Sequence, residues 1–334
     1  MNTVRELGGS TGIQISAIGL GCMQFSGPGL VSRFHTPLPQ PEVDAIVQAA
    51  LDGGLSWFDT AENYGKGTGE RKLATGLTNC GLKPGDTIVA TKWSPLGRTA
   101  KNLEKTIGNR LEALSPFPID LYQIHLGFGS FSSVTAQVHA LARLVEKGLV
   151  RSVGVSNFSA SQMVTAHRVL AEHGIPLASN QVRINMLSRE IETNGVLDAA
   201  RRLGITLIAY TPLSSGMLTG KFHSNRKLVE DIALLRRKSN GISNESLDRT
   251  QPLIDGLAQV ADRHEATVSQ VALAWLISYY GDTVVAIAGA SKPRHATEAA
   301  GVLKLQLSDE ELQHLAGLSA SVAKKGRTPT ESRS

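Results

Sequence analysis

Short apolar runs alternate with longer amphipathic stretches along most of the chain. Eight of these runs are bounded by polar or glycine-rich sequence, which is the pattern of a buried parallel strand. The runs end at Gly21, Asp59, Lys92, His125, Ser156, Val182, Tyr210 and Ile287. Stretches that read as helices mostly follow them, at 41–52, 70–77, 99–114, 134–147, 159–173, 195–203, 245–264, 269–278 and 294–301. This alternation predicts an α/β fold, a single (β/α)8 TIM barrel covering residues 1–320.

Three segments lie outside the alternation. Residues 4–21 predict an N-terminal β-hairpin around "GGSTG", placed where it would close the bottom of the barrel. Residues 211–244 form a long loop after the seventh strand, and loops of this length in a compact domain are usually functional or mobile. Residues 321–334 are polar and lack apolar anchors, which predicts a disordered tail.

The main alternative fold is a doubly wound open sheet, which would carry a glycine-rich dinucleotide-binding turn after its first strand. The first strand here leads into "GLGCMQ", where Gln24 stands in place of the third glycine. A P-loop is absent as well, because "GMLTGKF" has one residue too few between its glycines and Phe222 in place of Ser or Thr. Both observations favour the barrel.

The composition narrows the range of partners. The net charge is +5, and no basic cluster is interleaved with aromatic residues, so no nucleic-acid partner is expected. No apolar run approaches the ~18 residues of a membrane span, and the N-terminus lacks the apolar segment of a signal peptide. Two cysteines suit a reducing cytoplasm, and the nine histidines show no metal-ligand spacing.

Four ionisable side chains stand at or just after the ends of three successive predicted strands. Asp59 and Tyr64 lie in "WFDTAENYG", Lys92 ends "TIVATK" and His125 ends "DLYQIH". In a βα barrel such strand ends converge on one active site. A nearby ammonium lowers the pKa of a phenol, so Lys92 is expected to make Tyr64 a better proton donor. In this interpretation Asp59 holds Lys92 protonated, and His125 binds the oxygen of a carbonyl substrate.

Six motifs resemble those of the aldo-keto reductase family. They are "GLSWFDTAENYGKGTGE", "VATKW", "YQIH", "GLVRSVGVSNFS", "NQVRIN" and "IAYTPLSSGMLTGK", in the family's order, and the match runs from about residue 5 to 318. The resemblance implies a (β/α)8 barrel and an oxidoreductase that reduces aldehydes or ketones with NADPH. It places the catalytic tetrad on Asp59, Tyr64, Lys92 and His125, with Tyr64 as the general acid.

The resemblance also implies a nicotinamide site built without a Rossmann turn. Ser156, Asn157 and Gln181 match the residues that hold the carboxamide, and Tyr210 matches the aromatic residue that stacks on the ring. Cys22 and Met23 match positions at the nicotinamide end, where Asp59 also lies. The loop that contacts the pyrophosphate corresponds to Thr211, Pro212, Leu213, Ser214 and Ser215, followed by the basic residue Lys221.

The segment expected at the adenosine end departs from the family pattern. Gly289, Ser291, His295 and Glu298 occupy its positions, but His295 replaces the usual Gln or Arg, and Ala299 replaces an Asn. Lys292 and Arg294 stand nearby and could meet the 2′-phosphate. NADPH is therefore expected over NADH by a modest margin, and any share carried by protonated His295 should shrink as pH rises through about 6.5.

A second departure follows the catalytic histidine, where many relatives carry an aromatic residue. Leu126 and Gly127 predict a smaller and more mobile wall, and Phe128 and Phe131 could supply apolar surface instead. A bulky or aromatic carbonyl substrate is expected, with pyridoxal as one candidate. The alternative is an NADPH-binding regulatory subunit like the potassium-channel β-subunits, and His125, which those relatives lack, favours turnover. The sequence leaves the oligomeric state open.

Overall fold

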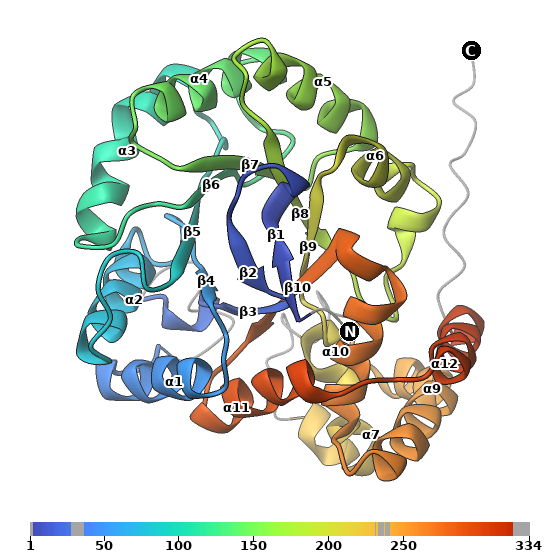
Figure 1. Ribbon diagram of the computed structural model, residues 1–334. Coiled ribbons are helices and arrows are strands. Elements are labelled where there is room, and N and C mark those ends of the chain that lie inside the picture. Colours follow the sequence, from blue (N-terminus) through green and yellow to red (C-terminus); the bar gives the residue numbers. More distant parts are fainter. Residues whose placement is uncertain (1–2, 28–36, 231, 233–236, 238–240, 323–334) are drawn as a thin grey trace.

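The computed structural model describes residues 3–27, 37–230, 232, 237 and 241–322. Eight parallel strands close into a barrel in the order β10-β3-β4-β5-β6-β7-β8-β9, with helices around it (Figure 1). The strands are β3 (Ile18–Gly21), β4 (Trp57–Asp59), β5 (Ile88–Trp93), β6 (Leu121–Ile124), β7 (Ser152–Ser156), β8 (Leu177–Arg183), β9 (Thr206–Tyr210) and β10 (Val284–Gly289). All eight predicted strands are present, and the predicted TIM barrel is confirmed.

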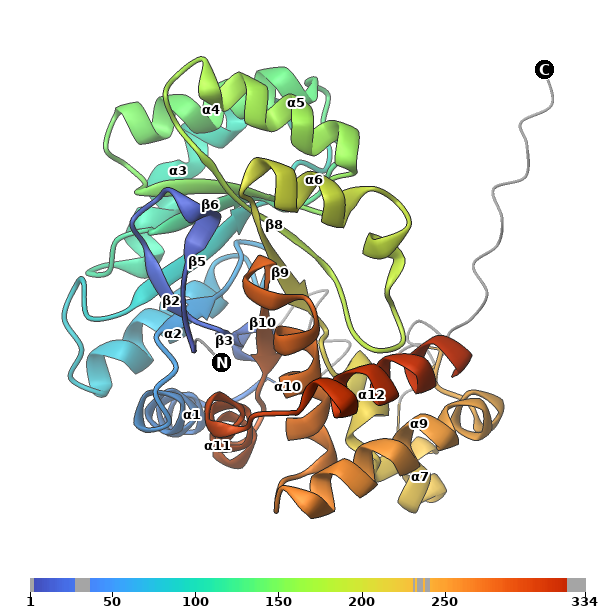
Figure 2. The same cartoon turned by 45° about the vertical axis from the view of Figure 1, so that its right-hand side comes forward.

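The predicted helices are also present, with small shifts at their ends. They are α1 (Gln40–Asp52), α2 (Thr68–Asn79), α3 (Ala100–Leu114), α4 (Val134–Glu146), α5 (Ala160–Ala171), α6 (Val196–Leu203), α9 (Asn244–Arg263), α10 (Val268–Tyr279) and α11 (Pro293–Gly301). A further helix, α12 (Asp309–Val322), lies along α9 at the outside of the barrel (Figure 2). Residues 321 and 322 of the predicted tail belong to α12, and the rest of that tail, from residue 323 onward, lies outside the described residues. Among those residues, no helix is both long and apolar enough to cross a membrane.

The N-terminal hairpin covers one end of the barrel, as predicted. Strands β1 (Val4–Glu6) and β2 (Gln14–Ser16) pair antiparallel across the centre of the ring (Figure 1). Leu7 and Ile15 pack into the barrel interior in one apolar cluster with Trp57 and Ile208. Gly8 adopts a φ of 64° and approaches so closely that an added Cβ would lie 2.6 Å from the Cα of Ala178. A side chain there would push the hairpin off the barrel.

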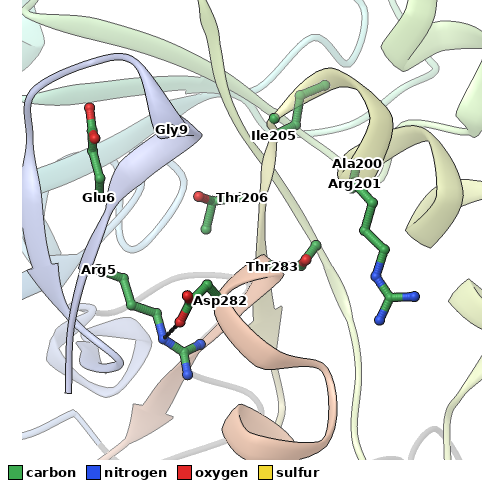
Figure 3. A pocket seen from close by; sticks show the side chains of 10 residues that line it. Arg5, Glu6, Gly9, Ala200, Arg201, Ile205, Thr206, Asp282 and Thr283 are labelled. Atoms are coloured by element: carbon green, nitrogen blue, oxygen red, sulfur yellow. Dashed lines mark ion pairs between the residues drawn. The ribbon is translucent and has the colours of Figure 1, made fainter. Parts of the chain in front are cut away.

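Arg5 fastens this hairpin to the barrel wall. Its guanidinium donates to the backbone oxygens of Ile277 at 2.6 Å and Gly281 at 2.9 Å, and also to that of Val284. A cavity of about 300 Å³ opens beside it (Figure 3). It is lined by Arg5, Glu6 and Gly9 of the hairpin, by Arg201 of α6, and by Thr206 and Asp282 near the N-terminal ends of β9 and β10. Because barrel enzymes carry out their chemistry at the opposite end of the strands, we assign this cavity to the hairpin junction.

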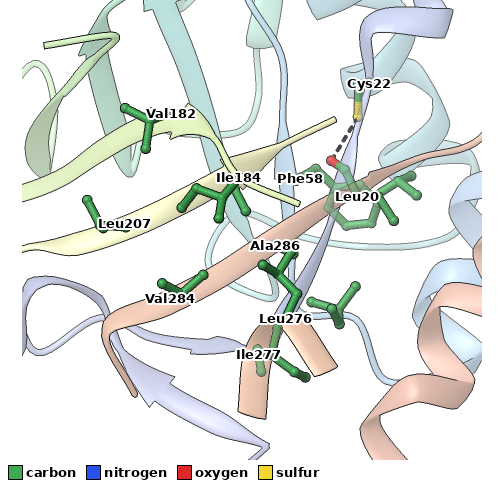
Figure 4. Close-up of a cluster of buried hydrophobic side chains, with 14 of the residues drawn as sticks. Leu20, Cys22, Phe58, Val182, Ile184, Leu207, Leu276, Ile277, Val284 and Ala286 are labelled. Atoms are coloured by element: carbon green, nitrogen blue, oxygen red, sulfur yellow. Dashed lines mark hydrogen bonds between the residues drawn. The ribbon is translucent and has the colours of Figure 1, made fainter. Parts of the chain in front are cut away.

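The main core fills the space between the strands and the surrounding helices. Leu276 and Ile277 of α10 face the barrel wall near Val284 and Ala286 of β10, as Figure 4 shows. These side chains are buried, and burying one large aliphatic side chain contributes roughly 1.5–3 kcal/mol. The core therefore sits around the barrel, and the strand ends are left to carry polar groups.

The long connection after β9 carries short helical segments within the described residues. These are η5 (Ser214–Thr219), α7 (Lys221–Ser224) and η6 (Arg226–Val229). Met217, Phe222 and Val229 form a small apolar cluster with Ile242 and Leu247. This cluster anchors the connection against the start of α9 and keeps its first turn beside the end of β9.

Candidate active site

The four residues predicted to carry the chemistry lie together at the C-terminal ends of the strands. Asp59 is the last residue of β4, Lys92 is the penultimate residue of β5, and His125 directly follows β6. Tyr64 lies on the loop between β4 and α2. The Nζ of Lys92 lies 5.4 Å from the centre of the Tyr64 ring, and the rings of Tyr64 and His125 meet edge to face with their centres 6.2 Å apart.

Asp59 and Lys92 form a buried ion pair. The Lys92 Nζ lies 2.5 Å from Asp59 Oδ1, and the two side chains are 0% and 1% exposed. Lys92 Nζ also donates to the backbone oxygen of Thr60 at 2.8 Å. Burial alone would lower the pKa of Lys92, but the charge of Asp59, together with Tyr64, outweighs burial and raises that pKa above its usual value. Lys92 therefore keeps its positive charge at neutral pH.

Tyr64 differs in one respect from the expectation. Burial raises the pKa of its hydroxyl, Lys92 lowers that pKa as predicted, Asp59 raises it again, and the net shift is upward. The phenol is therefore protonated at neutral pH. Because a weak acid gives its proton only to a strong base, this hydroxyl suits proton transfer to an alkoxide that forms at a reduced carbonyl.

His125 is held in its neutral form. Burial, and then the charge of Lys92, lower its pKa from 6.5 to about 3. Its Nδ1 has no hydrogen-bond partner among the described residues, and its backbone oxygen accepts a bond from Asn157 Nδ2 at 3.1 Å. A neutral imidazole donates an N–H hydrogen bond but is no source of a proton at neutral pH. Tyr64 is therefore the better candidate for the general acid.

Glu62 anchors the loop that carries Tyr64. Its carboxylate accepts hydrogen bonds from the backbone N of Ser94 at 2.6 Å, from Arg98 Nη1 at 2.6 Å and from Arg110 Nη1 at 2.8 Å. The partners belong to α3 and to the loop before it, so the carboxylate ties the Tyr64 loop to the next βα unit. The local sequence pattern gave no sign of this contact, because the two arginines lie 36 and 48 residues away along the chain.

Glu70 lies in the first turn of α2, directly after this loop, and makes the stability of the fold depend on pH. Burial raises its pKa from 4.5 to about 7, against the opposing effect of Arg110, whose Nε lies 2.9 Å from Glu70 Oε2 without forming a hydrogen bond. Because the folded protein keeps a proton that the unfolded chain releases, stability should fall as pH rises from about 4.5 to 7, by at most about 3 kcal/mol from this group.

We expect Glu70→Gln to remove this slope, so that the variant gains stability relative to wild type as pH rises through the same window. Urea unfolding at several pH values measures the difference. The control is Glu104→Gln, because hydrogen bonding to Arg143 holds the pKa of Glu104 below its usual value and places its titration below the window. A difference between wild type and Glu70→Gln that stays constant with pH would contradict the assignment.

The side chains predicted to hold a nicotinamide carboxamide also come together. Ser156 Oγ donates to the backbone oxygen of Gln181 at 2.8 Å, Asn157 Nδ2 donates to Ser156 Oγ at 3.0 Å, and the Tyr210 hydroxyl donates to Asn157 Oδ1 at 2.9 Å. Asn157 has a φ of 58°, a conformation that costs on the order of 1 kcal/mol for a residue other than glycine and that clusters at functional sites. This group of hydroxyl and amide side chains matches the donors and acceptors of a primary amide.

The loop after β9 has the backbone strain expected of a binding loop. Thr211, Ser214 and Ser215 have φ values of 52°, 49° and 56°, and Gly216 follows at 94°. The backbone N of Ser214 donates to Thr211 O at 2.9 Å, which helps to hold the strained turn. The Lys221 side chain folds over Gly216, where an added Cβ would lie 3.2 Å from its Nζ. Pro212 is buried and Leu213 half-buried in the same turn. A fixed loop beneath a cation fits a diphosphate group.

The residues expected at the adenosine end lie at the end of β10 and on α11. His295 Nδ1 accepts from the backbone N of Ser291 at 3.3 Å, and Glu298 accepts from Thr267 Oγ1 at 2.5 Å. Burial lowers the pKa of His295, and Arg294, Lys221 and Lys292 lower it further against Glu298. Gly289 faces the side chain of Gln24, whose amide would lie 2.9 Å from an added Cβ. Ala299 is buried.

The residues after β3 divide between core and surface. Cys22 is fully buried next to the tetrad, its backbone N donates to Asp59 O at 2.8 Å, and its Sγ contacts the backbone oxygen of Leu20 (Figure 4). Met23 is exposed. Burial raises the pKa of the Cys22 thiol well above its usual value, so it remains protonated. Over the described part of the chain, no group of three or more His, Cys, Asp and Glu side chains is arranged to hold a metal ion.

Comparison with known proteins places this site in a family. The sequence model of the aldo/keto reductase family matches residues 17–320. The chain is 32% identical over 313 residues to a chloroplastic pyridoxal reductase of Arabidopsis thaliana, covering 90% of this chain and 82% of the relative. It is 29% identical to a protein of Schizosaccharomyces pombe named aldo-keto reductase yakc (NADP(+)), covering 93% of this chain and 89% of the relative.

Solved structures agree with this relationship. A glycerol dehydrogenase from Gluconobacter oxydans superposes with a TM-score of 0.83 at 26% identity, over 100% of both chains. A thermostable aldo-keto reductase in complex with the inhibitor epalrestat gives a TM-score of 0.70 at 28% identity, over 94% of this chain and 99% of the other. The chain therefore belongs to the aldo/keto reductase family of nicotinamide-dependent oxidoreductases, and the predicted membership is confirmed.

Proposed function

We propose that this oxidoreductase reduces an aldehyde or ketone to the alcohol with NADPH, and that Tyr64 supplies the proton. The observation that carries the proposal is the buried Asp59–Lys92 pair beside a protonated Tyr64 phenol and a neutral His125. Three successive βα units deliver these groups to one end of the barrel. Because desolvation offsets most of the attraction within a buried ion pair, stability alone does not account for this pair, and a functional role is favoured.

The protein's part in the reaction follows from these protonation states. A bound nicotinamide would supply the hydride. His125 donates an N–H hydrogen bond to the carbonyl oxygen, and the Tyr64 hydroxyl donates a second one. As negative charge grows on that oxygen, the phenol transfers its proton, and Lys92 stabilises the phenolate that remains. The buried Asp59 keeps Lys92 charged throughout.

The substrate class is suggested by apolar side chains on two loops at this end of the barrel. Phe128 and Phe131 are 66% and 80% exposed, and Leu96 on the neighbouring loop is 53% exposed. The two loops are hydrogen-bonded to each other, from Gly97 N to Gly129 O at 2.8 Å and from Phe131 N to Arg98 O at 2.9 Å. Exposed apolar clusters mark binding surfaces. We propose a bulky or aromatic aldehyde, with pyridoxal as a candidate because one relative is named a pyridoxal reductase.

The wall after His125 is better fixed than the sequence suggested. Gly127 O accepts from Gln162 Nε2 at 2.6 Å, and an added Cβ on Gly127 would lie 2.8 Å from Asn157 O. The missing side chain lets the loop pack closely against the end of β7, so these contacts argue against a mobile wall.

NADPH is the proposed cofactor, bound through positive charge at the adenosine end. Because burial and neighbouring cations lower the pKa of His295, it should be neutral above about pH 6.5, and Lys221, Lys292 and Arg294 should carry the preference. We expect the Kd for NADH divided by the Kd for NADPH to stay constant between about pH 7 and 9. In the Lys292→Ala/Arg294→Ala variant this ratio should fall about tenfold.

Fluorescence titration with both cofactors measures these dissociation constants, and His295→Gln serves as the control that should leave the ratio unchanged above pH 7. A preference for NADH in the wild type would refute the assignment. So would an NADPH margin that is undiminished in the double variant.

The regulatory alternative has less support. The relatives described above are named as reductases or a dehydrogenase, and His125 is present and placed beside Tyr64. A cytoplasmic location is proposed from the low number of cysteines alone. The relatives give this proposal no support, because one of them is named as a chloroplast protein.

The direct test is an NADPH-oxidation screen over aliphatic and aromatic aldehydes and ketones, including pyridoxal, with a control that lacks substrate. We expect turnover with at least one carbonyl, fastest among bulky or aromatic aldehydes. NADPH binding without substrate-dependent oxidation across the panel would favour the regulatory alternative.

A further inference from the structure

Two glutamine side chains share one oxygen of the catalytic aspartate. Gln181 Nε2 donates to Asp59 Oδ2 at 2.9 Å, and Gln123 Nε2 donates to the same atom at 3.2 Å. The other oxygen, Oδ1, faces Lys92. The carboxylate plane is therefore fixed by three donors, and two of them come from strands β6 and β8 across the barrel interior.

The two glutamines differ in how their other ends are held. Gln123 is fully buried, and its Oε1 accepts from Ser179 Oγ at 3.3 Å. Gly154 lies on β7, between the strands that carry Gln123 and Ser179, and its lack of a side chain makes room for their contact. An added Cβ there would overlap Ser179 Oγ and lie 3.2 Å from Gln123 Cγ. Gln123 therefore has no polar group left for a ligand.

Gln181 has the opposite character. It lies at the end of β8 beside Ser156, and no described residue donates to its Oε1. Its amide oxygen is thus available to a carboxamide, as proposed for this position, while its Nε2 contacts Asp59. If the Gln181 amide binds a carboxamide, its hydrogen bond to Asp59 would be weakened or strained. Gln123 would then be the amide that still donates to Asp59 Oδ2.

We propose that Gln123 is a positioning residue for the tetrad, which holds the Asp59 carboxylate toward Lys92 independently of the cofactor, while Gln181 couples Asp59 to the cofactor. The inference rests on the proposed function, because it assigns a role within the same site. Gln123 acts on Tyr64 through Asp59 and Lys92, and it touches neither substrate nor cofactor. Without it, Asp59 keeps less of the hydrogen bonding that its buried charge requires.

The test compares matched variants at the two glutamines. Gln123→Met keeps the length and volume of the side chain but removes the donor, and Gln181→Met makes the same change at the other residue. We expect Gln123→Met to lower the single-turnover rate of carbonyl reduction about tenfold while the NADPH Kd, measured by fluorescence, stays within about twofold. Gln181→Met should instead weaken NADPH binding about fivefold.

A third variant separates positioning from simple packing. In Gln123→Glu a second carboxyl lies against Asp59, and two carboxyls this close share a proton, so the pKa of the pair is raised. When protonated, the new side chain can donate to Asp59 Oδ2. We expect a rate near that of wild type at about pH 6 that falls toward that of Gln123→Met by about pH 9. The rate lost in Gln123→Met should not recover at low pH.

The outcomes separate the two proposals. A wild-type protein without carbonyl turnover would overturn the proposed function. A wild type that turns over, with Gln123→Met within about twofold of its rate, would overturn only the role of Gln123. A loss of NADPH affinity in Gln123→Met equal to that in Gln181→Met would overturn it too. If Gln123→Met fails to fold, the pH profile of Gln123→Glu decides, and a pH-independent rate in that variant counts against the proposal.

Discussion

Tyr64→Phe is expected to abolish carbonyl reduction while leaving NADPH binding near normal. The substitution removes only the hydroxyl of Tyr64, which lies beside Lys92 and His125, is protonated at neutral pH and can release its proton to an alkoxide. General acid catalysis typically contributes about 10²–10⁴-fold. Steady-state and single-turnover rates, with cofactor Kd measured alongside, give the size of the loss.

Tyr210→Phe is the matched control, because it removes a phenolic hydroxyl that donates to Asn157 instead of facing His125. It should change cofactor affinity more than the rate of the chemical step. Retention of more than about a tenth of wild-type turnover by Tyr64→Phe would show that another group supplies the proton.

Lys92→Met should be nearly as damaging, and Asp59→Asn less so. Lys92 acts directly on the phenol, whereas Asp59 acts through Lys92. In Lys92→Met nothing stabilises the phenolate, and the buried carboxylate of Asp59 keeps only its two glutamine donors. In Asp59→Asn the ammonium remains, so part of its effect on Tyr64 survives.

Single-turnover rates of the two variants measure this order. Thermal unfolding is needed beside them, because breaking a buried ion pair from either side typically costs about 3–5 kcal/mol of stability. If folded Asp59→Asn is clearly slower than folded Lys92→Met, the expected order is reversed. Asp59 would then be the group that acts on the reacting atoms.

The barrel was predictable because its strands are short apolar runs with polar residues at their ends. Gly21, Asp59, Ser156 and Tyr210 end their strands where the pattern predicted. The meeting of Asp59 with Lys92 follows from the same rule, since parallel strand ends gather at one face of a barrel.

Other features depend on contacts that no local pattern encodes. Glu62 and Gln123 find their partners in distant segments, so nothing near them in the sequence distinguished them from surface or core residues. Whether the pKa of Tyr64 is raised or lowered depends on how the effects of burial and Asp59 compare with that of Lys92, and this balance follows only from the folded structure. Helix α12 is different, because Ser308 and Glu311 form a hydrogen-bonded capping pair whose spacing is visible in the sequence.

Transfer of hydride from the cofactor to the carbonyl carbon can be followed with deuterium. Wild-type protein is incubated with NADPH that carries deuterium at both hydrogen positions of nicotinamide C4 and with the best aldehyde from the screen. The alcohol is then analysed by mass spectrometry and NMR. We expect one deuterium on the former carbonyl carbon with wild type, and no such product above background with Tyr64→Phe. Alcohol formed without deuterium at that carbon, or equal labelled product from both proteins, would contradict it.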